Sequence, residues 1–543
     1  MTSRFAVRSS FHRGGGGAQA PTKRRNQLAL AISTLLAASA PMALLTTAGV
    51  ALLAPQQTRA QDATSGEIFG RVNDDSGNPV AGVDVVLTDD SRGFRATSTT
   101  GSDGVFRFGR LANGDYKATV GDATRDVRVS AGTVQTLTFT VSGDSNATRL
   151  AQVVVTGQAA TSTAKDYYSQ ESGINIDIDQ LLTRVPVPRN IMDAALLAPG
   201  VTQGDRNFEA ASGGELVSFA GSSAGENVFL INGYNSTDPR RFLGLMNSIP
   251  FEFFQQIDVK TGGFQAEYGR ATGGIISLVT RSGSNDLTAG TSVFYTPEDL
   301  RAHQKDTRDI FRSNDTQKNV ETNVWASGAL IKDRLFFYGL LNYRSEGFTN
   351  FGNSTVDKLS DNDPFFGFNI DGVLFDSEQW GRHSFTYTHI DDSHKTRTVQ
   401  NNFDRDALEV GEERGIRIDN LGGNTDIIKY TGVIRDWLTI SGLYGSSNAR
   451  FDFSTNKDLN PAIDDTRSGT TVNLGNFTSI GLTPVDNDSR DVYRVDADIF
   501  VNDLLGDHKF RLGYEREELT SSEASAFSGG VHFNPPKLRV IRK

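Results

Sequence analysis

The chain has 543 residues, with 54 basic and 65 acidic residues, 55 glycines, 34 phenylalanines and no cysteine. This length exceeds that of one ordinary domain, so we expect several modules, and the lack of cysteine excludes disulfides, thiolate metal sites and cysteine nucleophiles. Abundant glycine and aromatic residues with only 15 prolines favour β-structure with tight turns over helical bundles or disorder.

The first 60 residues differ in composition from the rest of the chain. They hold seven basic residues and no acidic one, a charge-free stretch over residues 28–54, and small residues at Thr58 and Ala60. This order predicts a signal peptide over residues 1–60, cleaved after Ala60, although the long apolar stretch leaves an uncleaved anchor open. Removing the seven from the total of 54 leaves 47 basic residues against 65 acidic ones, which argues against nucleic acid as a partner.

Residues 61–145 are predicted to form a small β-sandwich. Seven short runs with strand-like composition, among them "GEIFGRV", "GVFRFGRL" and "TVQTLTFTV", are separated by the turn sequences "NDDSGNP", "GSDG" and "ANGD". The pattern "GRVNDDSGNPVAGVDVVL" followed by "TTGSDGVFRFGRLANGDYKATV" resembles the carboxypeptidase regulatory-like domain. That resemblance implies a binding or spacer module without catalytic residues.

A short β-branched run lies in the next segment, residues 146–160. It consists of Gln152, Val153, Val154, Val155 and Thr156, and small and polar residues flank it. One interpretation is a further sandwich strand or a linker; the other is an exposed strand that pairs with an edge strand of a partner. The run resembles the TonB box, the peptide through which an inner-membrane energy transducer pulls on outer-membrane receptors. The resemblance implies a TonB-type transducer as partner.

Residues 161–285 are predicted to form a mixed α/β unit, with a helix over 190–197 and strands over 226–235, 256–260 and 275–280. Five glycines precede the last strand, and glycines permit tight turns and close packing inside an enclosing wall. The stretch "IDVKTGGFQAEYGRATGGIISLVTRSGSND" resembles the plug of TonB-dependent outer-membrane receptors, in particular the Oar-like subgroup, which also carries the regulatory-like module. Asn232 stands where the family has Asp. The motif residues are Gly262, Gly263, Glu267, Tyr268, Gly269, Arg270, Gly273 and Gly274.

Residues 286–543 are predicted to form long antiparallel transmembrane strands. Apolar Tyr493 and Val495 alternate with charged Arg494 and Asp496, and the run after residue 508 repeats this pattern. A soluble sandwich is the alternative. The segment has room for roughly 10–12 spanning strands, whereas a plugged receptor barrel needs about 22, so we expect the first part of an outer-membrane β-barrel and a C-terminally truncated receptor. The predicted fold class is thus mainly β: sandwich, plug and partial barrel.

Two local patterns suggest chemistry. "GSSAG" around Ser223 fits a hydrolase nucleophile motif but lies in a predicted loop, and His389, Asp391 and His394 are not spaced for a closed metal site. We therefore expect no enzyme activity, no cofactor and no metal.

The function implied by the resemblance is uptake of a solute across the outer membrane of a Gram-negative cell. The expected partners are the transducer, outer-membrane lipid and an extracellular solute, which could be a siderophore, a saccharide or a peptide. A cell-surface adhesion or structural β-protein, and a receptor fragment without function, are the alternatives.

Overall fold

The computed structural model describes part of the chain, and all of that part belongs to one compact unit, residues 57–543. Among the residues described, no helix is long and apolar enough to cross a membrane. The described ranges are 64–141, 172–184, 189–204, 216–240, 244–264, 267–303, 305–307, 312–455, 462–465, 472–473, 482–501, 508–527 and 532–533.

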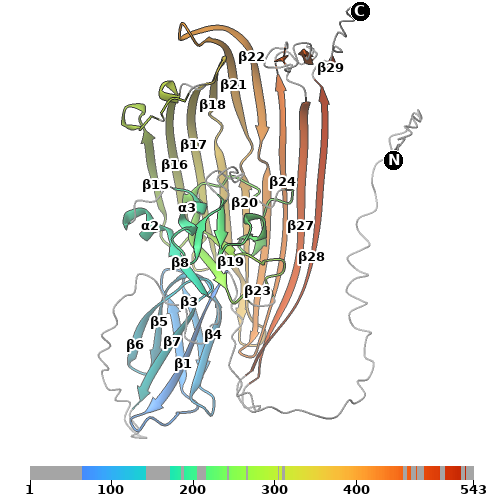
Figure 1. The fold of residues 1–543 in the computed structure, drawn as a ribbon. Coiled ribbons are helices and arrows are strands. Elements are labelled where there is room, and N and C mark those ends of the chain that lie inside the picture. Colours follow the sequence, from blue (N-terminus) through green and yellow to red (C-terminus); the bar gives the residue numbers. More distant parts are fainter. Residues whose placement is uncertain are drawn as a thin grey trace, which may run out of the picture. The chain divides into compact units, whose positions relative to one another are not determined.

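The first module is a β-sandwich with a core of its own (Figure 1). One sheet has the order β4-β1-β7 and the other β3-β2-β5-β6. Strand β1 runs parallel to β7, and the core side chains include Ile68, Phe106 and Phe139. All seven predicted strands are present, because alternating apolar residues and glycine-rich turns specify them locally. Their bounds are β1 Gly66–Asp74, β2 Asp84–Asp89, β3 Phe94–Thr99, β4 Val105–Leu111, β5 Gly114–Val120, β6 Ala123–Val129 and β7 Val134–Val141.

The second module, here called the plug, contains a five-stranded sheet of order β12-β11-β14-β13-β8. Its elements are β8 Ser172–Asp177, α2 Ile178–Arg184, α3 Ile191–Ala195, β9 Val201–Gln203, β10 Val217–Phe219, η1 Ala224–Glu226, β11 Val228–Ile231, β12 Tyr234–Asn235, η2 Phe251–Phe253, β13 Phe254–Gly262 and β14 Ile275–Thr280. The predicted strands are confirmed. The predicted helix is shorter than expected and begins after Asn190, whose side chain accepts a 2.7 Å hydrogen bond from the Met192 N–H. Helix α2 was not expected.

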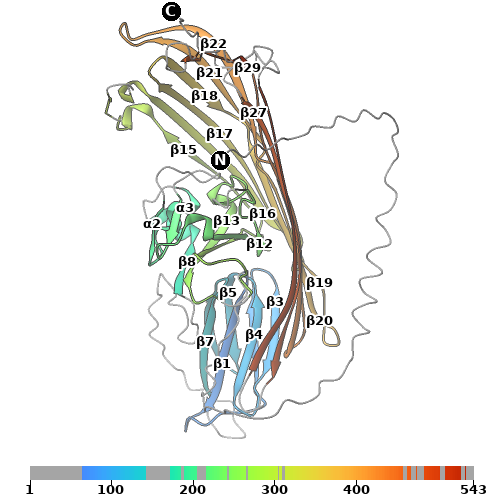
Figure 2. The same ribbon diagram turned by 45° about the vertical axis from the view of Figure 1, so that its right-hand side comes forward.

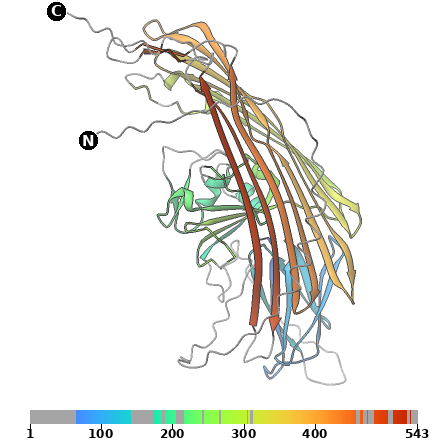
Figure 3. The ribbon, with the colours of Figure 1, turned by 90° about the vertical axis from the view of Figure 1, so that its right-hand side faces the viewer.

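The third module is a 12-stranded sheet, here called the wall, and it corresponds to the predicted partial barrel. Figures 1 and 3 show its long strands, with β15 at one edge and β28 at the other. The remaining elements are β15 Thr288–Thr296, η3 Glu298–Leu300, η4 Arg312–Asn314, β16 Thr316–Ile331, β17 Leu335–Phe351, β18 Thr355–Asp361, β19 Phe365–Ser377, β20 Gly381–Asp391, β21 His394–Asp404, β22 Glu409–Leu421, β23 Asn424–Arg435, β24 Leu438–Thr455, β25 Ala462–Asp465, β26 Val472–Asn473, β27 Leu482–Val501, β28 His508–Phe527 and β29 His532–Phe533.

Six of the wall strands are the two halves of three interrupted strands. Strand β17 pairs along its length first with β19 and then with β18, and β24 pairs with β23 and then with β22. The breaks fall at residues 362–364, 392–393 and 422–423. The third break consists of Gly422 and Gly423. Neither glycine can carry a Cβ, which would lie 2.3 Å from the Asp392 carbonyl oxygen or 2.2 Å from that of Asn448.

The two faces of the wall differ in polarity as the alternation predicts. On β28, Leu512 and Tyr514 are 63% and 70% exposed, whereas the preceding Arg511 points to the opposite face and is largely buried. The same holds on β27 for exposed Val495 and buried Asp498. The exposed apolar face has the pattern of a membrane barrel's outer surface, and the polar face is the one the plug covers.

The plug and the wall share one hydrophobic core. Plug residues such as Phe253 pack in the same cluster as the wall residues Tyr338, Phe365 and Leu443. The ring centroids of Phe253 and Phe365 lie 5.8 Å apart in an edge-to-face arrangement. Figure 2 shows the plug strands beside the wall.

Two plug glycines offer a matched test of close packing. A Cβ on Gly274 would lie 2.2 Å from the Phe219 ring, whereas a Cβ on Gly269 would meet no atom within 4 Å. We expect Gly274→Ala to lower the free energy of unfolding by about 1–3 kcal/mol through overpacking. Gly269→Ala should change it far less. The measurement is urea unfolding of the detergent-solubilised protein followed by tryptophan fluorescence, and equal midpoints for the two variants would contradict the packing argument.

Candidate functional site: the contact between plug and wall

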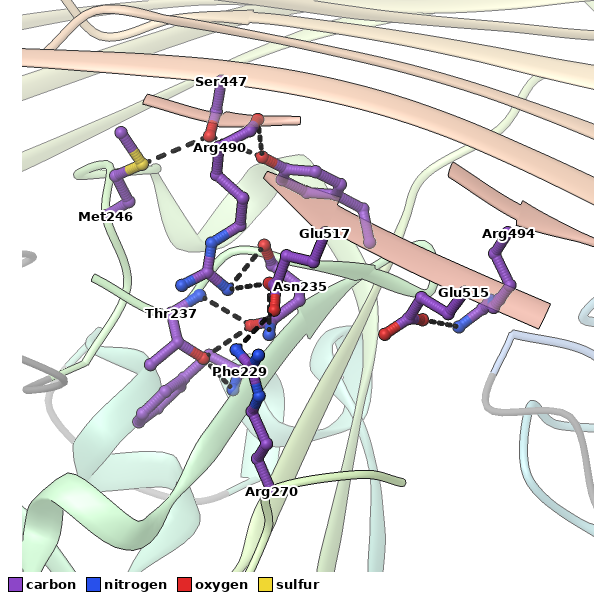
Figure 4. Close-up of polar contacts among 11 residues, drawn as sticks. Phe229, Asn235, Thr237, Met246, Arg270, Ser447, Arg490, Arg494, Glu515 and Glu517 are labelled. Carbon is purple, nitrogen blue, oxygen red and sulfur yellow. Dashed lines mark hydrogen bonds and ion pairs between the residues drawn. The ribbon is translucent and has the colours of Figure 1, made fainter. Parts of the chain in front are cut away.

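Two plug segments that were identified from the sequence contact the same carboxylate of the wall. They are the hairpin of β11 and β12, turning at Asn232 and Gly233, and the turn that contains Arg270. Arg270 Nη1 lies 2.6 Å from Glu517 Oε2, and Asn235 Nδ2 donates to Glu517 Oε1 at 3.1 Å. Figure 4 shows these side chains converging on Glu517. The Glu517 side chain is only 8% exposed, whereas that of Arg270 is 69% exposed, so water competes little at the carboxylate but reaches the arginine.

A buried wall arginine completes this contact. Arg490 is 1% exposed, and its Nη1 lies 3.0 Å from Glu517 Oε1 and donates to the Asn235 carbonyl oxygen at 3.2 Å. A single carboxylate thus receives donors from two plug residues and one wall residue. Because an unpaired buried charge is costly, this arrangement holds the plug in one position.

Tyr234 fixes the hairpin tip against the wall. Its hydroxyl donates to the Arg490 carbonyl oxygen at 3.0 Å and lies 2.5 Å from Ser447 Oγ. Burial raises the pKa of the Tyr234 hydroxyl well above its ordinary value, so the hydroxyl remains a donor. The ring lies against Gly445, where a Cβ would approach it to 2.2 Å.

Further polar contacts connect the plug to the wall around this centre. Arg240 pairs with Asp486 and Asp488, both at 3.0 Å, and with Glu523 at 3.4 Å; its hydrogen bond with Asp488 raises the pKa of Arg240. Arg189 pairs with wall Glu321 at 3.3 Å. Plug cations therefore meet wall carboxylates at three separate places.

At the strand break of residues 392–393, a wall carboxylate binds uncharged donors of the plug. Buried Asp392 accepts from Asn247 Nδ2 at 2.6 Å, from the Ser248 N–H at 2.7 Å and from the Gly423 N–H at 2.9 Å. The Asp392 carboxylate at this break thus binds both the plug and the neighbouring break at Gly423.

Asn232, the departure from the family pattern, lies in this contact. Its Nδ2 donates to Thr388 Oγ1 of the wall at 2.9 Å and to Thr280 Oγ1 at 2.7 Å. Thr388 Oγ1 donates in turn to Asn369. An aspartate at position 232 has no N–H to give, so the amide suits this hydrogen-bond pattern.

The other predicted residues occupy varied places. Gly262 and Gly263 end β13, Glu267 pairs with wall Arg511, and the Tyr268 ring lies 5.5 Å from Lys260 Nζ. Gly273 is held close to Asn227, where a Cβ would approach Oδ1 to 2.4 Å. The run 152–156 and the cleavage position Ala60 lie outside the described residues.

The residues considered for chemistry are dispersed. Ser223 precedes η1 in a plug loop. His389 Nδ1 lies 2.8 Å from Asp426 on the neighbouring strand, while His394 begins the next strand and lies 3.8 Å from Asp361. Among the described residues, no group of three or more potential ligands could hold a metal.

Sequence reasoning named Arg270 and Glu267 but missed Glu517, Arg490 and Arg240. Glu517 lies 247 residues beyond Arg270, and one chain carries no signal of that pairing. The sequence does show that β27 and β28 each have a polar face directed inward. This pattern identifies charged wall residues that need partners, but it does not identify the plug residues that pair with them.

Comparisons with known proteins agree with this arrangement. Residues 67–142 match the carboxypeptidase regulatory-like domain, and residues 175–275 match the TonB-dependent receptor plug domain. The chain is 30% identical over 295 residues to the TonB-dependent transporter Oar of Myxococcus xanthus, which covers 51% of this chain and 26% of Oar. The chain thus spans about a quarter of that relative.

Two solved structures of outer-membrane proteins also align with part of this chain. The transporter YddB from Escherichia coli aligns with 66% of this chain and 55% of its own, at 12% identity and a TM-score of 0.42. The siderophore receptor PirA from Acinetobacter baumannii aligns with 64% of this chain and 47% of its own, at 17% identity and a TM-score of 0.39. These scores are low, so the assignment depends on the sequence matches.

The segment that matches the plug domain of TonB-dependent receptors lies against a wall of long antiparallel strands. Together with the regulatory-like domain and the similarity to Oar, this match supports an Oar-like TonB-dependent receptor. The similar proteins are named as transporters and receptors, not as enzymes.

A substitution at Glu517 tests the contact. Glu517→Gln should lower the free energy of plug detachment by about 2–3 kcal/mol, because hydrogen bonds to a charged group are the stronger ones. Of the three tryptophans, Trp325 packs against the shared core while Trp380 and Trp437 are exposed, so its fluorescence at low urea reports detachment.

The neighbouring Glu518 provides the matched control. Its side chain is 49% exposed and pairs with Arg516 on the outer face of the wall. Glu518→Gln should leave the fluorescence transition within about 0.5 kcal/mol of the parent, as is usual for exposed pairs. Equal shifts in both variants would contradict an anchoring role for Glu517.

Proposed function

We propose that the chain is part of an outer-membrane TonB-dependent receptor that takes up a solute and is driven by a TonB-type transducer. The observation that carries the proposal is a plug that is enclosed yet anchored by discrete polar contacts. Arg270, Arg240 and Arg189 each meet a wall carboxylate. Such contacts hold a plug firmly at rest but can be broken in sequence, because each exchanges one polar partner for water.

A location in the outer membrane is supported by the outward faces of β27 and β28. Apolar residues on these faces are exposed, and only helices or closed barrels satisfy their backbone groups in lipid. The predicted signal peptide over residues 1–60 supplies the export route.

The predicted transducer strand is well placed in the sequence to act on the plug. Residues 152–156 lie before β8 in the chain, and among the described strands β8 is an edge strand of the plug sheet that pairs with β13 alone. Tension on the chain before Ser172 would load the β8–β13 ladder first. An edge strand is released by breaking one ladder, whereas a central strand requires two.

Recognition of residues 152–156 by the transducer is proposed to use backbone pairing. In β-augmentation the main-chain hydrogen bonds carry the affinity, so an extended backbone matters more than side-chain identity. The class of solute stays open among siderophore, saccharide and peptide.

We expect Val154→Pro to weaken binding of the transducer's periplasmic domain by about tenfold or more, because proline removes an N–H donor and disfavours ladder pairing. The measurement is calorimetric titration of the solubilised protein with that purified domain. Ala160→Pro, beyond the β-branched run, is the control and should bind normally.

Equal affinity of Val154→Pro and the parent would overturn the assignment of residues 152–156. Absence of binding by the parent chain would favour an adhesion or structural protein, which has no need of a transducer. In an intact receptor, Val154→Pro should abolish energised uptake.

A further inference from the structure

The sandwich contacts the wall through Arg92, whose Nη1 lies 3.4 Å from Asp371 Oδ2 on β19, and through two more deeply buried ion pairs. Arg110 Nη2 and Nε lie 2.7 and 2.9 Å from Asp498 Oδ2 on β27. Lys509 Nζ on β28 lies 3.0 Å from Glu67 Oε2 on β1. All four side chains are at most 8% exposed, so each charge depends on its partner rather than on water.

Two further features single out this contact. Arg107 Nε lies 3.0 Å from Glu67 Oε1, and the Arg107 guanidinium lies 4.4 Å from the ring centre of Phe500 on β27. Arg110 has a φ of 55°, a left-handed conformation that costs energy for a residue other than glycine. Such a conformation persists where surrounding interactions hold it, and the pair with Asp498 is one such interaction.

The contact continues to the plug. Asp498 Oδ1, the oxygen that Arg110 does not approach, lies 3.1 Å from Arg511 Nε, and Arg511 pairs in turn with Glu267 of the plug. One carboxylate therefore links a sandwich arginine to an arginine held by the plug. We call this group the junction; it comprises Glu67, Arg107, Arg110, Glu267, Asp498, Lys509 and Arg511.

The sandwich is bound differently from the plug. The plug shares one hydrophobic core with the wall, whereas the core cluster of the sandwich contains sandwich residues alone. Buried ion pairs contribute little net stability, because the cost of desolvation offsets most of the attraction. The sandwich can therefore leave the wall without disrupting a core, and its charges regain hydration when it does.

The charge balance makes this docking sensitive to the plug. The junction holds four cations and three carboxylates, and Glu267 is the one carboxylate that the plug supplies. Withdrawal of Glu267 leaves four cations on two carboxylates. Arg511 then competes with Arg110 for Asp498, and like charges repel across the sandwich contact.

We propose that the sandwich is a releasable latch: it docks on the inner face of the wall through the junction while the plug is seated, and it is released when the plug withdraws Glu267. This assigns a conformational role to the regulatory-like domain. It does not depend on uptake or on the transducer.

The absence of cysteine makes a direct test possible in the full chain. Gly109 lines the cavities between the sandwich and the wall, and a Cβ there would meet no atom within 4 Å, so Gly109→Cys is tolerated and covered in the docked state. Ser76→Cys, in an exposed turn of the same module, sets the rate for an open site. The rate of reaction with a bulky maleimide is measured in membranes that hold the protein.

We expect Gly109→Cys to react about tenfold or more slowly than Ser76→Cys, as a site protected by docking should. Adding Arg110→Gln or Lys509→Gln should remove most of this protection, because each removes one of the two cations that its buried carboxylate binds. Arg95→Gln, which neutralises an exposed arginine on β3, should not.

The link to the plug is tested by Glu267→Gln. It should accelerate labelling at position 109 although it alters neither the sandwich nor the wall. Ala118→Cys, in the sandwich core, must stay unreactive in every variant, which separates release from unfolding of the module.

Three results would overturn the proposal. Equal rates for Gly109→Cys and Ser76→Cys in the parent would show that the sandwich is not docked. Unchanged protection with Arg110→Gln and Lys509→Gln would show that the ion pairs do not hold it. Unchanged protection with Glu267→Gln would remove the coupling to the plug.

Discussion

The pairing of charged groups on the inner face of the wall is the constraint on which the structure depends. A membrane strand presents apolar residues to lipid on one face, so polar residues gather on its inward face. Enclosed carboxylates such as Glu517 then need donors, and the plug supplies them through Arg270 and Asn235. The requirement of the wall for counter-charges and the requirement of the plug for anchors are met by the same contacts.

This principle explains why the plug resembles a folded core in one respect and an interface in another. Phe253 and its neighbours pack with wall aromatics as densely as in a domain interior. Around that core, carboxylates at Glu517 and Asp392 fix the register of two loops. Apolar burial supplies most of the affinity, and the polar contacts determine the position, because an unpaired buried charge penalises any displaced arrangement.

Much of the fold could be predicted from the sequence, because it follows from local signals. The sandwich strands alternate in polarity between glycine-rich turns, and the Asn-Gly turn after β11 specifies its hairpin. Helix α2 was not predicted, because its seven residues are too few to show a helical period of apolar residues. Gly422 and Gly423 indicated a loop, yet they are required by the close approach of Asp392 and Asn448. Only the plug side of the site could be predicted, because the plug motif is contiguous in the sequence. The wall residues Glu517 and Arg490 reach the plug through the register of the wall strands, which one sequence does not reveal.

The central claim is that charge-paired contacts hold the plug in a single position against the wall. The most direct measurement is the distance between two spin labels placed by cysteine substitution in this cysteine-free chain, one at Gly269 on the plug and one at Glu518 on the wall. We expect one narrow distance distribution in the resting protein, and we expect this distribution to broaden in the Glu517→Gln variant. A broad distribution in the protein that retains Glu517, or a distribution that does not change in the Glu517→Gln variant, would contradict a single charge-paired position of the plug.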